Sequence, residues 1–107
     1  MQHISPRQLA DWLADASRSR PVLLDVREAA EFDICHIPGA QLMPMHTVPL
    51  RVQELSPDTD TVVICHHGGR SMQVAMFLHQ RGFSRLYNLS GGVNGWACSV
   101  DPNMPQY

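Results

Sequence analysis

One short segment combines residue types that could carry covalent chemistry. It runs from Cys65 to Arg70 with the sequence Cys-His-His-Gly-Gly-Arg, and it directly follows the apolar run from Thr61 to Ile64. A cysteine thiolate is a nucleophile, and adjacent glycines let the backbone turn so that successive N–H groups face one point. Arg70 adds a positive charge. This spacing predicts a loop that stabilises negative charge on or near Cys65.

The residues after the loop predict a helix from Ser71 to Arg81, closed by Gly82. The N-terminus of such a helix carries roughly half an elementary positive charge. We therefore expect Cys65 to be ionised at neutral pH and to act without a dedicated general base. The alternative, an inert buried cysteine, is disfavoured by the surrounding glycines and arginine. The groups expected to bind the substrate are His66, His67, Gly68, Gly69, Arg70 and Ser71.

The rest of the chain alternates between strand-like and helix-like patterns. Strands are expected over residues 22–26, 40–43, 61–64 and 86–89. Helices are expected after the Ser5-Pro6 cap and over residues 27–32, 48–55, 71–81 and 93–97. This alternation predicts an α/β domain with a mainly parallel sheet. Ligands of such sheets bind beyond the carboxyl ends of the strands, which is where Cys65 falls.

Length and composition exclude several classes of protein. With 107 residues, the chain predicts one domain, and its last residues, 98–107, predict an extended, loosely ordered tail. All eight basic residues are scattered arginines and the net charge is −2, so no nucleic-acid partner is expected. No apolar run reaches about 18 residues, so no membrane span is expected.

The cysteines indicate a reducing environment. Cys35, Cys65 and Cys98 form an odd set with no paired spacing, which argues against a disulfide scaffold. With no export signal recognised at the N-terminus, a cytoplasmic location is expected. No second pair of ligands accompanies the loop, so no metal site is expected. Cys98 is interpreted as a surface or packing thiol, with a thiol that attacks Cys65 as the less favoured alternative.

Four motifs in a fixed order resemble those of the rhodanese-like sulfurtransferases. They are the segments 24–28 (Leu-Asp-Val-Arg-Glu) with 31–32, 36–40 (His-Ile-Pro-Gly-Ala), 65–70, and Gly91-Gly92 with Trp96. The resemblance covers roughly Ile4 to Trp96. It implies a single rhodanese-like domain over residues 1–107. The implied architecture is a three-layer sandwich with a central, mainly parallel five-stranded sheet flanked by helices.

The resemblance also implies a reaction in two steps. Cys65 takes the outer sulfur of a donor such as thiosulfate and becomes a persulfide, and an acceptor (cyanide, a thiol or a protein) then takes that sulfur. No cofactor is implied, and a monomer is expected. Two alternatives stay open: a sulfur carrier or regulatory module with little turnover, and a cysteine-dependent phosphatase or arsenate reductase. Phosphatases and arsenate reductases of this kind have one more residue between cysteine and arginine. The shorter loop here therefore favours sulfur transfer over their reactions.

Five residues outside the loop are expected to support the site. Arg27 is expected to pair with a carboxylate such as Asp25 or Glu31 and to fix the loops, rather than to perform acid–base chemistry. His36 is expected to be a buried hydrogen-bonding residue. Trp96 is expected to form core or pocket wall.

Two features depart from the family pattern. Cys35 stands where the family usually has glycine, and His66 and His67 stand where many relatives have arginine or lysine. Neutral imidazoles attract thiosulfate less than fixed cations do. The resulting hypothesis is that thiosulfate turnover improves as pH falls toward the range in which histidine is protonated, until protonation of the thiolate opposes it.

Overall fold

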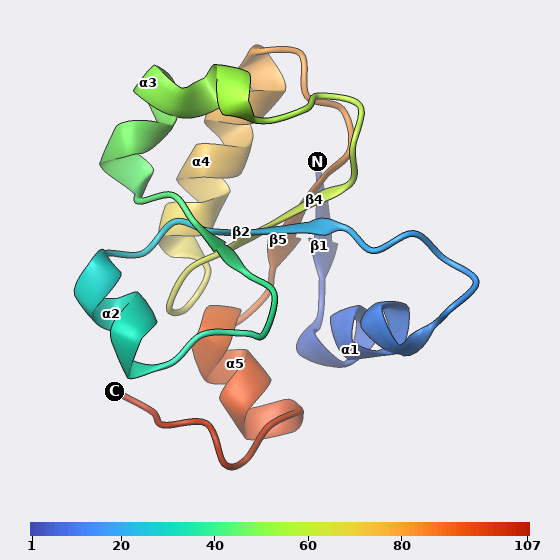
Figure 1. Ribbon diagram of the computed structural model, residues 1–107, viewed down its shortest axis with the longest axis vertical. Coiled ribbons are helices and arrows are strands. Elements are labelled where there is room, and N and C mark those ends of the chain that lie inside the picture. Colours follow the sequence, from blue (N-terminus) through green and yellow to red (C-terminus); the bar gives the residue numbers. More distant parts are fainter.

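A sheet of five parallel strands runs through the middle of the protein (Figure 1). This computed structural model describes all residues, 1–107. The strand order is β1-β5-β4-β2-β3, with bounds β1 Gln2–Ile4, β2 Val22–Asp25, β3 Gln41–Leu42, β4 Thr61–Ile64 and β5 Leu86–Leu89. The α-helices are α1 Pro6–Ala14, α2 Ala29–Ile34, α3 Val48–Arg51, α4 Gly69–Gln80 and α5 Gly92–Ser99. The expected α/β class and the five-stranded sheet are confirmed.

Alternating side chains on the strands create two separate cores. Leu23, Val62 and Ile64 pack on the face covered by α1 and α5. Leu24 and Val63, one residue along each strand, pack on the opposite face with α3 and α4. Both faces are covered, so β4 is buried along its whole length. This burial explains why the central strands are continuous apolar runs with clear bounds in the sequence.

Strand β1 was not predicted. It has three residues, too few to show a periodic pattern, and it pairs in parallel with β5 from Gln2 opposite Tyr87 to Ile4 opposite Leu89. Helix α1 then begins where it was expected. The Ser5 side chain accepts a hydrogen bond from the Gln8 backbone N–H, and the Gln8 side-chain oxygen accepts one from the Ser5 N–H.

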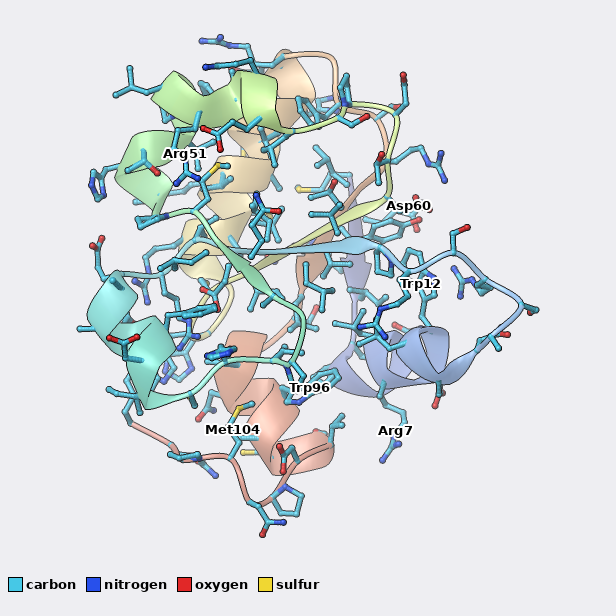
Figure 2. All side chains as sticks on the ribbon, in the orientation of Figure 1. Arg7, Trp12, Arg51, Asp60, Trp96 and Met104 are labelled. Carbon is cyan, nitrogen blue, oxygen red and sulfur yellow. The ribbon has the colours of Figure 1, made fainter.

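The two tryptophans anchor the layer formed by α1 and α5. Trp12 on α1 and Trp96 on α5 are almost fully buried and belong to the same core (Figure 2). Trp96 therefore takes the first of its two expected roles, that of a core residue. Its burial fixes α5, whose N-terminal end lies against the loop that follows β4.

Two segments differ from the expected helices. Within residues 48–55, α3 is a single α-helical turn, Val48–Arg51, followed by a 3₁₀ turn, Val52–Glu54. Another 3₁₀ turn, Met45–Thr47, precedes it, and Pro49 lies in the first turn of α3, as expected. Helix α4 begins at Gly69, two residues before the expected start. Its N-cap, Gly68, has a φ of 119°, which only glycine adopts easily.

The C-terminal segment has no helix or strand beyond Ser99, and it contacts the body of the protein. Its expected loose order stays a prediction. Helix α5 extends to Ser99, beyond the start of the expected tail at residue 98. Met104 is buried beside α5 (Figure 2). The chain then returns to the end of α2 (Figure 1), where Tyr107 contacts Glu31. No helix has the length and apolar character needed to cross a membrane.

Candidate active site

Cys65 lies at the carboxyl end of β4, where the sheet delivers it to the start of α4. Its side chain is only 1% exposed. The Gly68 N–H donates to the Cys65 Sγ at 2.9 Å, and the Ser71 hydroxyl lies 3.3 Å from the same sulfur. The backbone therefore turns around the sulfur within three residues, as the two glycines predict.

Ser71 connects the sulfur to β5. The Ser71 hydroxyl makes a short hydrogen bond to the Asn88 side-chain oxygen and lies 3.1 Å from the Gly68 carbonyl. A hydroxyl has one proton, so it can donate to only one of these acceptors or to the sulfur at a time. Asn88 was missed by the sequence reasoning. The available signal was a polar residue within the otherwise apolar inner positions of β5.

Helix α5 orients the peptide planes of the loop. The Val93 N–H donates to the Cys65 carbonyl at 2.9 Å, and the Asn94 N–H donates to the His66 carbonyl at 3.1 Å. In a trans peptide the N–H points opposite to the carbonyl. Since both carbonyls face α5, the N–H groups of His66 and His67 face the other way, into the loop.

Gly92 permits this close approach. A Cβ atom on Gly92 would lie 2.2 Å from the Cys65 carbonyl oxygen, and the φ of Gly92 is +57°. No side chain fits there. This contact explains one glycine of the pair at residues 91–92. Position 92 requires glycine because α5 touches the backbone of the loop there.

Several loop amides remain free to bind an anion. Apart from Gly68, whose N–H reaches the sulfur, five amides at the loop and the first turn of α4 have no acceptor within the protein. They belong to His66, His67, Gly69, Arg70 and Ser71. Unpaired donors at a helix N-terminus, aided by the helix dipole, form a site for negative charge.

Arg70 is paired, which corrects the expectation of a free positive charge. Its guanidinium donates to both carboxylate oxygens of Glu31, at 2.6 and 2.8 Å. These hydrogen bonds lower the pKa of Glu31 to about 2, and the same contact raises the pKa of Arg70. Glu31 is 39 residues away in the sequence, and its α2 reaches the loop only in the folded chain. The pair is close to neutral.

Arg27 is also paired, as the sequence predicted. It is fully buried, and it donates to both oxygens of Asp25 at 2.7 to 3.1 Å. It also donates to the Cys35 carbonyl at 2.7 Å, which joins the end of β2 to the end of α2. Both arginines near the site are therefore compensated by a carboxylate.

Tyr107 was missed because no local pattern marks it. Its hydroxyl accepts from Arg27 at 2.8 Å and donates to Glu31 at 2.9 Å. Its ring stacks on His66 with centroids 4.0 Å apart and planes 9° apart. Burial, together with the adjacent His67, lowers the pKa of His66 below its ordinary value of 6.5.

Comparisons with known proteins give the family. The model of the rhodanese-like domain matches residues 5–98. This chain belongs to the rhodanese-like domain family. It is 38% identical over 97 residues to a sulfurtransferase of Allochromatium vinosum, covering 91% of this chain and 89% of that protein. It superposes on a crystal structure of a rhodanese-like domain protein from Staphylococcus aureus with a TM-score of 0.84 at 26% identity, covering 100% and 99% of the two chains.

Some relatives are much longer. The chain is 42% identical over 89 residues to the chloroplastic rhodanese-like/PpiC domain-containing protein 12 of Arabidopsis thaliana. That match covers 79% of this chain and 30% of the plant protein. The rhodanese-like domain is thus one part of that relative, and its other parts have no counterpart in the match.

Three residues of this rhodanese-like domain lie apart from the sulfur. His36 is exposed, which corrects the expectation of burial: its ring stacks on Phe32, and its Nδ1 lies 2.9 Å from the Phe32 carbonyl. Cys98 is exposed on α5. Cys35 is buried in the core that contains Trp96, on the face of the sheet opposite the core that contains Cys65.

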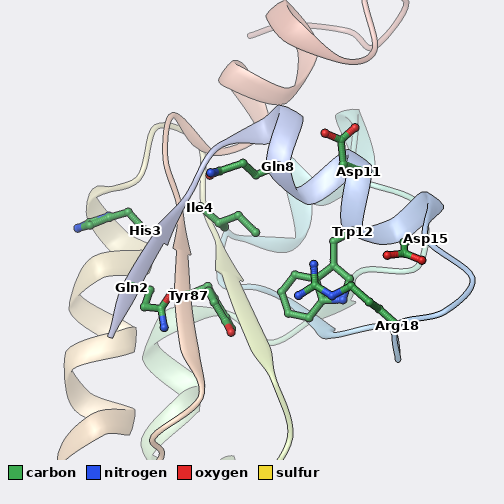
Figure 3. Close-up of a pocket in the computed structure, with 9 residues that line it drawn as sticks. All are labelled: Gln2, His3, Ile4, Gln8, Asp11, Trp12, Asp15, Arg18 and Tyr87. Carbon is green, nitrogen blue, oxygen red and sulfur yellow. The ribbon is translucent and has the colours of Figure 1, made fainter.

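The largest hollow of the protein is elsewhere. It has a volume of about 420 Å³ and lies between β1 and α1, with Trp12, Arg18 and Tyr87 in its wall (Figure 3). It shares no residue with the loop. No three histidine, cysteine, aspartate or glutamate side chains converge where they could hold a metal ion.

Proposed function

We propose that this protein is a sulfurtransferase that moves a sulfane sulfur through a persulfide on Cys65. The donor is a compound such as thiosulfate, and the acceptor is a thiophile: cyanide, a thiol or a protein. The observation that supports this most is the turn of unpaired amides around the Cys65 sulfur, with the Gly68 N–H already in contact.

The two steps balance without a cofactor. The Cys65 thiolate attacks the outer sulfur of thiosulfate, a new S–S bond forms, and sulfite leaves with the electron pair of the broken S–S bond. Cyanide then attacks the outer sulfur of the persulfide, thiocyanate leaves, and the thiolate returns. The free loop amides can stabilise the outer sulfur of the anionic persulfide.

The features of this loop fit sulfur transfer better than phosphate chemistry. Four residues separate Cys65 from Arg70, and none of them is an acid that could protonate a leaving alkoxide. Arg70 is engaged by Glu31 instead of facing the centre of the loop as a free guanidinium. Both features reduce the attraction for a tetrahedral oxyanion carrying several charges.

Turnover assays test this function. Thiocyanate formation from thiosulfate and cyanide is expected for the wild-type protein and is expected to be absent from Cys65→Ser. Cys98→Ser, which changes an exposed thiol, serves as the matched control and is expected to keep full activity. Release of phosphate from an aryl phosphate without any thiocyanate would contradict the proposal.

A cytoplasmic location stays a prediction, tested by fractionating cells.

A further inference from the structure

The charge around the loop points to a particular class of sulfur donor. Rhodanese-type chemistry brings the Cys65 thiolate against the sulfane sulfur of its donor. Thiosulfate carries two negative charges, so this encounter needs positive charge nearby to offset the repulsion. Arg70, the one arginine of the loop, is held by both oxygens of Glu31. Arg27, behind it, is held by both oxygens of Asp25.

His66 does not replace these cations at neutral pH. His66 is half-buried and its ring stacks on Tyr107, with centroids 4.0 Å apart and planes 9° apart. The His67 ring also lies 4.0 Å away, tilted by 37°. Such packing disfavours the imidazolium form. The groups left to interact with the donor are the neutral backbone amides of the loop. Their dipoles can stabilise one negative charge on a sulfur, but they do not supply a net positive charge that attracts a dianion.

Two of these rings, those of Tyr107 and His67, are exposed. The rings of Tyr107, His66 and His67 follow one another beside the loop. A planar organic group can lie against such rings. Thiosulfate consists only of sulfur and oxygen, so it has no organic group that could lie against these rings.

We infer that the site selects organic sulfane-sulfur donors with a single negative charge, such as an organic persulfide, over the thiosulfate dianion. This inference rests on the proposed function and names its substrate class. The thiolate attacks the outer sulfur of the persulfide anion R–S–S⁻, and a new S–S bond forms on Cys65. The S–S bond of the donor breaks, and the thiolate R–S⁻ leaves with its electron pair.

The test compares donors of matched chemistry. The probes are thiosulfate with two charges, methanethiosulfonate with one charge, and benzenethiosulfonate with one charge and a ring. Each passes one sulfur to Cys65, releasing sulfite or a sulfinate, and cyanide converts the product to thiocyanate. The wild-type kcat/KM is expected to be highest for benzenethiosulfonate and lowest for thiosulfate, with weak dependence of the thiosulfate rate on salt.

Glu31→Gln isolates the effect of charge from the reactivity of the donors. Glutamine can still accept from the Glu28 N–H, so the cap of α2 is kept, while Arg70 loses its counter-charge. The kcat/KM for thiosulfate is expected to rise relative to methanethiosulfonate by roughly tenfold, and this gain is expected to disappear at high salt.

Asp60→Asn is the matched control. Asp60 is paired with Arg85 through two side-chain hydrogen bonds at 3.0 and 2.7 Å, away from the loop, so its loss changes the net charge equally. The donor ratio is expected to stay at the wild-type value. An unchanged ratio in Glu31→Gln, or thiosulfate as the best donor of the wild type, would overturn the inference. Absence of thiocyanate from all three donors would instead refute the sulfurtransferase function.

Discussion

Among single residues, Ser71 controls the surroundings of the sulfur most closely. It is fully buried, and its hydroxyl lies between the Cys65 sulfur and the Asn88 side chain. Ser71→Ala removes the side-chain donor nearest the sulfur, and one hydrogen bond is worth roughly 1 kcal/mol or more when its partner is charged. We expect kcat/KM for sulfur transfer to fall roughly tenfold. Ser84→Ala, at an exposed position, is the control, and equal activity in both variants would contradict this role for Ser71.

His66 has a consequence for pH dependence. Because burial and His67 lower its pKa below 6.5, His66 gains its proton only at a pH lower than a free imidazole does. Any gain in thiosulfate turnover from a cationic His66 is therefore expected below pH 6.5 and not between pH 8 and 6.5. An NMR titration of the imidazole protons measures this directly. A His66 midpoint at or above 6.5 would contradict the structure.

At the scale of elements, the contact between α5 and the loop is fixed by Gly92. In Gly92→Ala the new methyl group would overlap the Cys65 and His66 carbonyls, at 2.2 and 2.5 Å. We expect the free energy of unfolding to fall by about 3 kcal/mol or more, with loss of sulfur transfer.

Gly82→Ala separates this clash from backbone strain. Gly82 also has a positive φ, +92°, but no atom lies within 4 Å of the position its Cβ would take. Its substitution is expected to cost only about 1–2 kcal/mol. Urea denaturation of both variants gives the comparison. Equal losses would mean that strain alone, and not the packing of α5 on the loop, makes Gly92 necessary.

At the scale of the whole molecule, the link between α2 and the loop predicts sensitivity to acid. The pKa of Glu31 is about 2 in the folded protein, against an ordinary value of 4.5. A depressed pKa contributes stability that is fully present above the unfolded value and is lost as pH falls from 4.5 toward 2. Glu31→Gln is expected to show a smaller loss over this range than the wild type. Parallel stability curves for the two proteins would contradict the contribution of Glu31.

The sequence predicted best what depends on neighbouring residues. Strand β4 was predicted with its observed bounds because it is buried along its whole length. Strand β5, which begins and ends with leucine, was also predicted with its observed bounds. The turn around the Cys65 sulfur could be predicted because it is formed by six consecutive residues, 65–70. The Arg27 pair was predicted because its partner, Asp25, is two residues away.

The sequence predicted poorly what depends on distant residues. The charge state of Arg70 is decided by Glu31, and the cover over His66 is provided by Tyr107 at the end of the chain. Neither contact leaves a periodic pattern. His36 was expected to be buried, but it lies between the buried residues Cys35 and Ile37 and is itself exposed.

The persulfide on Cys65 is the claim on which this account depends most, and mass spectrometry tests it directly. The protein is incubated with thiosulfate or benzenethiosulfonate and digested without reductant. The masses of its cysteine-containing peptides are then measured. We predict a gain of one sulfur atom on the peptide that holds Cys65 and no such gain on the Cys35 or Cys98 peptides. No added sulfur with either donor, or sulfur found only on Cys35 or Cys98, would contradict it.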